Sequence, residues 1–161
     1  MTDLARPAIL LVDDEEMIVT SIKSFLAVET DYHLLAYTSP LTALQDLEAR
    51  ITTIDLAISD YLMPEMDGIS FLADVKRKFP LAPRILLTGY ADKGNAIQAI
   101  NRVGLYQYIE KPWNNDDLRL VIHNGLEKAA LLRQLEEKVH EVERVHKELN
   151  DVQREILRVF V

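Results

Sequence analysis

The strongest constraint on the fold is an alternation between short apolar runs and longer segments of helical spacing along the first 125 residues. The runs are mostly apolar, which is typical of strands buried on both faces of a parallel sheet. The segments between them repeat apolar residues every three or four positions, as one face of a helix does. The pattern therefore predicts an α/β fold with a doubly wound, five-stranded parallel sheet, because right-handed crossovers carry helices to both faces. The predicted strands are 8–12, 34–37, 56–59, 84–87 and 106–109.

Beyond Asp116 the helical pattern runs on without a break. From Leu132 onward, apolar residues alternate between steps of three and four, which is the spacing of a coiled-coil seam. One step of three falls where four is due, between Val142 and Val145, and it resembles a stammer. A long apolar stripe of this kind needs a partner, and a parallel homodimer is the simplest solution.

We accordingly expect two parts, a globular domain at 1–125 and a coiled-coil dimerisation helix at 126–161. Asn124–Gly125 is the expected hinge between them, because glycine inside a helix costs about 1 kcal/mol relative to alanine. The last residues, 156–161, are densely apolar, and we expect an output domain outside this chain.

Composition narrows the partners. The chain has 26 acidic and 18 basic residues, for a net charge of −8, and no basic face of the kind that binds nucleic acid. It has no cysteine and no apolar stretch near the ~20 residues that a membrane span requires. We therefore expect a cytoplasmic protein that binds neither nucleic acid nor membrane through this segment.

Polar residues lie at the end of four of the predicted strands, within two positions of the last strand residue. In an open parallel sheet, side chains at the carboxyl ends of the strands meet at one edge, where ligands bind. Three clustered carboxylates repel one another unless a cation joins them, and oxygen ligands suit Mg²⁺. A lysine and a hydroxyl beside them suit a phosphoryl group. Singly, each of these residues would be read as a helix cap, a turn or a surface charge. The residues are Asp13, Asp14, Asp60, Thr88 and Lys111.

Four motifs together resemble the signature of response-regulator receiver domains of two-component systems, over about residues 7–125. The motifs are Asp13–Asp14, DYLMPEMDG from Asp60, LLTGYAD around Thr88, and YIEKPW around Lys111. The resemblance implies a flavodoxin-like sheet with strand order 2-1-3-4-5. It also implies a switch that is phosphorylated in a Mg²⁺-dependent reaction by a sensor histidine kinase or a phosphotransfer protein, rather than an enzyme.

The resemblance implies roles for individual residues. Asp60 would carry the phosphate, and Thr88 and Lys111 would contact its oxygens. The metal ligands would be Asp13, Asp14, Asp60 and the backbone carbonyl of Leu62.

Other positions would support or tune the site. Tyr108 would turn inward on activation together with Thr88. Lys111–Pro112 would be a cis bond, and Gly68 would permit the tight loop after Asp60. Leu62 and Tyr90 would flank the path of the water that removes the phosphate. Both are bulky and neither is acidic or an amide, so we predict that the phosphate is lost slowly compared with a variant that carries Asn at position 62.

Two other functions stay open from the sequence. The acidic cluster could belong to a Mg²⁺-dependent phosphohydrolase that turns over repeatedly. The chain could also be a degenerate receiver that acts only as a dimerisation scaffold. The stretch ELNDVQREIL weakly resembles the helix before cyclic-di-GMP phosphodiesterase domains of the HD type, and diguanylate cyclase domains are joined similarly, so either could be the output.

Overall fold

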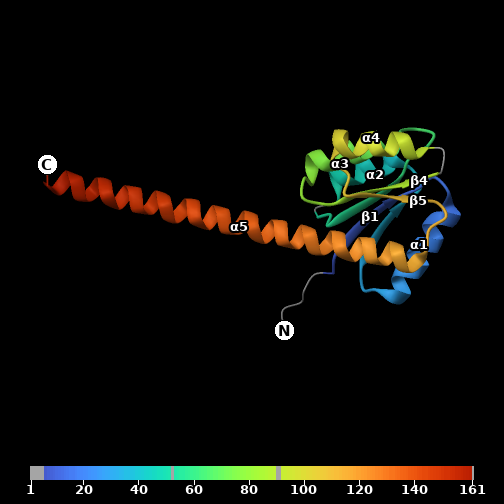
Figure 1. Cartoon of the computed structure of the whole chain (residues 1–161), viewed down its shortest axis with the longest axis horizontal. Coiled ribbons are helices and arrows are strands. Elements are labelled where there is room, and N and C mark those ends of the chain that lie inside the picture. The colour runs from blue at the N-terminus through green and yellow to red at the C-terminus, as the bar shows by residue number, and fades with distance from the viewer. Residues whose placement is uncertain (1–5, 52, 90–91, 161) are drawn as a thin grey trace. The chain divides into compact units, whose positions relative to one another are not determined.

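The computed structural model describes residues 6–51, 53–89 and 92–160, in which five strands alternate with five helices (Figure 1). The strands are β1 (Ala8–Val12), β2 (His33–Tyr37), β3 (Leu56–Asp60), β4 (Arg84–Thr88) and β5 (Gln107–Glu110). The helices are α1 (Glu16–Glu29), α2 (Pro40–Ala49), α3 (Gly68–Lys78), α4 (Lys93–Val103) and α5 (Asn115–Phe160).

The strands form a single parallel sheet in the order β2-β1-β3-β4-β5, which confirms the predicted fold. The register aligns the carboxyl ends of the three central strands. Val12 of β1 pairs with Ser59 of β3, and Asp60 pairs with Leu87 of β4. Thr88 pairs with Glu110 of β5. The residues that end or directly follow these strands therefore share one edge of the sheet.

Alternate residues of each strand enter two separate cores, one on each face of the sheet. Leu10 of β1 packs in the core under α2, α3 and α4, and its neighbour Leu11 packs in the core under α1 and α5. Both are 0% exposed. Because complete burial of a leucine side chain contributes about 1.5–3 kcal/mol, this two-sided burial anchors the strands.

Local capping explains where three helices begin. The Ser39 hydroxyl accepts the Thr42 N–H at the start of α2. Asp67 caps α3 by accepting the Ser70 N–H at 2.7 Å. Asn114 does the same for α5, accepting the Asp116 N–H at 2.8 Å. These side chains satisfy N–H groups that have no partner inside the helix.

α5 is continuous through Gly125, and this glycine is buried. A Cβ at this position would lie 3.0 Å from Leu56 Cδ1 and 3.2 Å from Tyr106 Cε1, both tight contacts. The structure therefore gives Gly125 a packing role, in which the absence of a side chain lets α5 approach the sheet closely. A free hinge was the sequence expectation.

The chain divides into two units, one that ends at Ala129 and one that spans Ala130–Val161. In the first unit α5 buries Leu118, Ile122 and Ala129. The second unit consists of the rest of α5, whose apolar side chains are exposed. Among the described residues, no helix combines the length and apolarity that crossing a membrane requires.

We predict that Gly68→Ala destabilises the protein by about 1–3 kcal/mol, because a Cβ there would overlap the Asp60 carbonyl oxygen and press on Leu86 Cδ1 at 3.0 Å. Gly94→Ala is the matched control, since nothing lies within 4 Å of its Cβ position and alanine favours helix. Urea unfolding of both variants measures the difference. Equal stabilities would contradict the close approach at Gly68.

Candidate functional site

Two buried aspartates lie side by side at the carboxyl edge of the sheet. Asp60 ends β3 and is 7% exposed, and Asp13 follows β1 and is 0% exposed. Backbone donors hold both carboxylates: the Glu15 N–H donates to Asp13 Oδ1 and the Tyr61 N–H donates to Asp60 Oδ1, each at 2.9 Å. The two carboxylates are therefore fixed in place by the turns that follow their strands.

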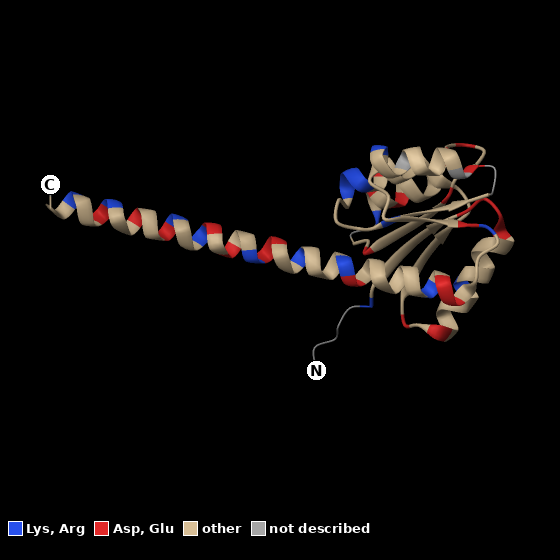
Figure 2. Ribbon diagram, in the orientation of Figure 1, with Lys and Arg blue, Asp and Glu red and all other residues tan. Residues whose placement is uncertain are grey.

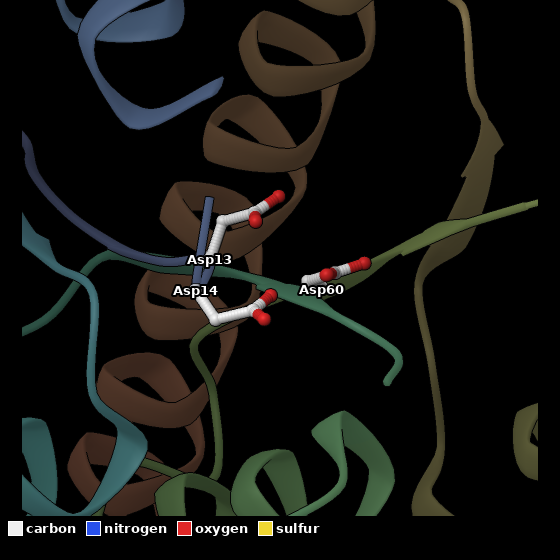
Figure 3. A group of neighbouring side chains, drawn as sticks. All are labelled: Asp13, Asp14 and Asp60. Carbon is white, nitrogen blue, oxygen red and sulfur yellow. The ribbon is translucent and has the colours of Figure 1, made fainter. Parts of the chain in front are cut away.

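Asp14 completes a carboxylate cluster. One oxygen from each of Asp13, Asp14 and Asp60 lies within 4.8 Å of the other two, although Asp14 itself is exposed. Figure 3 shows the three side chains reaching from neighbouring strand ends toward a common space. The cluster thus has two buried members and one member that faces solvent.

Lys111 enters the same site from the end of β5. Its ammonium lies 3.1 Å from Asp13 Oδ2 and 3.1 Å from Asp60 Oδ1. The Lys111 N–H donates to the Thr88 carbonyl at 2.7 Å, and the following bond to Pro112 is cis, as the family resemblance implies. Lys111 is thus placed to offset the charge of two carboxylates at once.

The remaining predicted residues surround this centre at different depths. Thr88 is fully buried, and its hydroxyl lies 3.5 Å from the Ile109 carbonyl oxygen. Tyr108 is half-buried against the core under α2, α3 and α4. The Leu62 side chain is 60% exposed beside the site. Tyr90 lies outside the described residues.

Burial and like charge shift the protonation of the site. Burial, with a further contribution from Asp13, raises the pKa of Asp60 to about 6, although Lys111 and the Tyr61 N–H act in the opposite direction. Burial also raises the pKa of Asp13. Burial lowers the pKa of Lys111, but Asp13 and Asp60 outweigh it and the net shift is upward. The site therefore favours a cationic lysine and resists a second full carboxylate charge.

These features fit a hard divalent cation. The cluster offers oxygen ligands only, and its exposed member leaves a side open to water and to a further oxygen ligand. Mg²⁺ prefers such a set, because it keeps several waters and binds one or two carboxylates together with phosphate. A cation would also offset the repulsion from Asp13, which adds to the effect of burial in raising the pKa of Asp60.

Sequence reasoning missed the backbone and loop contacts that orient the site. The N–H groups of Glu15 and Tyr61 fix the two buried carboxylates, and no residue type signals a backbone donor. The loop after β3 is tied to the start of α2, because the Ser39 hydroxyl donates to Glu65 Oε2 at 2.8 Å. The DYLMPEMDG motif contains Glu65, but only the fold brings Ser39 beside it.

The chain is similar in sequence to known proteins. The family described as response regulator receiver domain matches residues 9–123. A putative NtrX-like response regulator from Rickettsia bellii is 34% identical over 128 residues, covering 78% of this chain and 26% of that protein. The hydrogenase transcriptional regulatory protein HoxA from Bradyrhizobium diazoefficiens is 30% identical over 128 residues, covering 80% of this chain and 26% of that protein.

Solved structures agree in fold. The signal receiver domain of an HD domain-containing protein from Pseudomonas fluorescens Pf-5 has a TM-score of 0.71 and 38% identity, covering 78% of this chain and 98% of that one. The chain spans about a quarter of the length of the two curated relatives.

We predict that Asp60→Asn stabilises the metal-free protein at pH 7.5, by up to about 3 kcal/mol. The pKa of Asp60 is raised from 3.8 to about 6 in the folded state. The folded state therefore binds more protons than the unfolded state between these values, and stability falls as pH rises through the window. Urea unfolding at pH 4 and pH 7.5, without Mg²⁺, measures the effect.

The gain should vanish at pH 4, where Asp60 is protonated in the folded state. Asp14→Asn removes the same formal charge from an exposed side chain of the cluster, and we expect a smaller gain. An Asp60→Asn variant that is less stable than the parent at pH 7.5 would contradict the repulsion.

Proposed function

This chain belongs to the response regulator receiver domain family, and from that premise we propose that it is a switch whose phosphate is carried on Asp60. One observation carries the assignment of the residue. Asp60 lies within 4.8 Å of Asp13 and Asp14, and Lys111 lies 3.1 Å from two of the three carboxylates. A buried aspartate with a lysine and a potential cation site beside it is suited to accept a phosphoryl group.

The contacts of Asp60 suggest which of its oxygens reacts. Within the described part of the chain, its hydrogen bond from Tyr61 and its ion pair with Lys111 are both made by Oδ1. Oδ2 is then the oxygen that attacks phosphorus. The bond from phosphorus to the donor breaks, and its electron pair leaves with the donor nitrogen or oxygen. The product is an acyl phosphate on Asp60.

Lys111, Thr88 and Tyr108 would read the new group. The Lys111 ammonium can move from Asp13 to a phosphoryl oxygen without leaving the site, because it already lies between the two aspartates. Among the described residues, the Thr88 hydroxyl has one hydrogen bond, a long contact of 3.5 Å with the Ile109 carbonyl, so turning toward the phosphate costs little. Tyr108 would then move into the space that Thr88 leaves.

We assign the cation site to Asp13, Asp14, Asp60 and the backbone carbonyl of Leu62. When bound there, Mg²⁺ would neutralise charge on the transferring group. The backbone N–H donors from Glu15 and Tyr61 hold two of these carboxylates in place for binding.

The proposed phosphodonor is a sensor histidine kinase or a phosphotransfer protein in the cytoplasm. We further propose two functional parts, a receiver at 1–125 and a helix at 126–161 that dimerises in parallel and transmits the signal. Acidic residues outnumber basic ones in both parts, so we propose that neither part binds nucleic acid.

The output of the full protein is a separate proposal. An HD-type cyclic-di-GMP phosphodiesterase fits the HD domain-containing relative, which is 38% identical over its receiver domain. A diguanylate cyclase would use the same connecting helix. The similarity to HoxA favours instead an output in transcriptional regulation. In each case the receiver would act as the switch and not as the enzyme.

We predict that the full chain, incubated with acetyl phosphate and Mg²⁺, accumulates one phosphoryl group that is acid-stable and base-labile. Intact-protein mass spectrometry measures the stoichiometry, and Asp60→Asn should remain unmodified. Asp14→Asn keeps the acceptor but removes a proposed metal ligand, so it should require more Mg²⁺. Continuous phosphate release without accumulation would indicate a phosphohydrolase, and a folded chain that takes up no phosphate would indicate a scaffold.

We predict that Leu62→Asn shortens the lifetime of the phosphate by about threefold to tenfold. The exposed Leu62 side chain beside the site offers no polar group to a water, whereas an amide can orient one for attack. Loss of the phosphate over time, followed by mass spectrometry after removal of acetyl phosphate, gives the rate. Leu62→Met is the matched apolar control and should keep the parent lifetime.

A further inference from the structure

The second unit of the chain carries an apolar stripe with a strict spacing. Four residues follow one another at intervals of seven, which is two turns of a coiled-coil helix. All four are more than half exposed, from 51% to 68%. A stripe of this kind lies on one side of a helix and is the core of a seam. Its members are Leu135, Val142, Leu149 and Ile156.

The stripe is flanked by apolar residues on different sides in the two halves of the helix. In the first half the flank is Leu132 and Val139, three residues before the stripe members. In the second half it is Val145, Val152 and Val159, three residues after them. The change of side, between Val142 and Val145, is the irregular step in the spacing.

We propose that residues 132–159 pair with a second copy of this chain in two competing registers that share the stripe. The inference rests on the proposed dimer and deepens it. In the first register the stripe occupies the d positions of the heptad, and in the second it occupies the a positions. The two registers differ by a rotation of each helix of about 50° about its own axis.

Each register is apolar in one half and interrupted by polar residues in the other. Continuing the first register brings His146 and Gln153 to the seam. Extending the second register backward brings Lys138 there. Polar residues at seam positions cost stability and select register, so neither uniform register is free of cost. The lowest-cost seam changes register at Val142–Val145 and can yield to either uniform one.

The charges beside the seam favour a parallel second copy as the occupant. In the first register, Lys138 of one helix faces Glu143 of the other across a parallel seam. In the second register, Glu141 faces His146. In an antiparallel pair in the first register, Glu136 and Glu143 of one helix would instead face glutamates of the other helix, and like charges would repel. Figure 2 shows acidic and basic residues interleaved along this part of α5, so no single-sign face points to an oppositely charged partner.

A groove in the structure coincides with the change of register. It is lined by Lys138, Glu141, Val142, Val145, His146 and Leu149. This set includes two stripe members, one flank residue, and Lys138 and His146, which the second and the first register respectively bring to the seam. At this groove the partner helix would contact either the flank before the stripe or the flank after it.

Single-cysteine variants of the full chain test the registers, because the protein has no cysteine of its own. Leu149→Cys reports the shared stripe and should cross-link under mild oxidation in either register. Val152→Cys reports the second register, and Gln153→Cys reports the first. Arg154→Cys points outward in both and is the negative control. In the parent background we expect cross-linking at 149 and 152 to exceed that at 153.

A background that reverses the preference supplies the decisive comparison. Val145→Gln with His146→Leu makes the second register polar and the first apolar at this point. The ratio of cross-linking at 153 to that at 152 should then rise by about tenfold. Lys138→Leu completes the second register and is the matched change, so it should leave 152 ahead of 153.

Two outcomes overturn the proposal, and they differ. Strong cross-linking at 149 with 152 ahead of 153 in every background would mean one register only. No cross-linking at 149, with a monomer in sedimentation equilibrium, would remove the second copy as occupant. Phosphate uptake by Asp60, measured on the same preparations, separates either failure from a failure of the receiver assignment.

Discussion

The structure depends on the balance of charge between two buried aspartates and one lysine. Asp13 and Asp60 are almost fully buried, and this burial raises the pKa of both; the charge of Asp13 raises that of Asp60 further. Lys111, at 3.1 Å from both, supplies the nearest compensating charge. One lysine cannot neutralise two carboxylates, and Asp14 adds a third to the cluster. The site is therefore poised to take up a further positive charge, and a cation that joins the carboxylates makes room for a phosphoryl group.

The sheet stabilises this unfavourable arrangement of charge, because it holds the carboxylates and Lys111 in place before any ligand binds. Parallel strands in the order β2-β1-β3-β4-β5 bring the ends of β1, β3 and β5 to one edge. Burial on both faces holds the strands in register, and backbone N–H groups hold the carboxylates. Because the sheet already holds the carboxylates close together, a cation that binds them would relieve their repulsion and would not have to order the side chains first.

The sequence predicted the fold because two-sided burial of the central strands leaves a clear pattern, namely short, mostly apolar runs that alternate with segments of helical spacing. It predicted which residues meet at the edge for the same reason, because parallel strands all point their carboxyl ends one way. It could not predict the donors from Glu15 and Tyr61, since every residue has a backbone N–H. The hinge at Gly125 stays a prediction, because a glycine that permits close packing, as the structure shows here, and one that permits bending look alike in a sequence.

The two units of the chain use opposite physical strategies. In the first unit each strand has one register. A shift by one residue would move every side chain of the strand to the opposite face of the sheet, where it would not fit the core. In the proposed pairing of the second unit, the stripe of Leu135, Val142, Leu149 and Ile156 would serve two registers equally, and only the flanking residues would favour one of them. A signal that changes a few contacts cannot shift the sheet, whose alternatives are far higher in free energy. If the helices pair as proposed, the same small change would redistribute two registers that differ by a few polar side chains, and the extension would then be the part of the chain best able to respond.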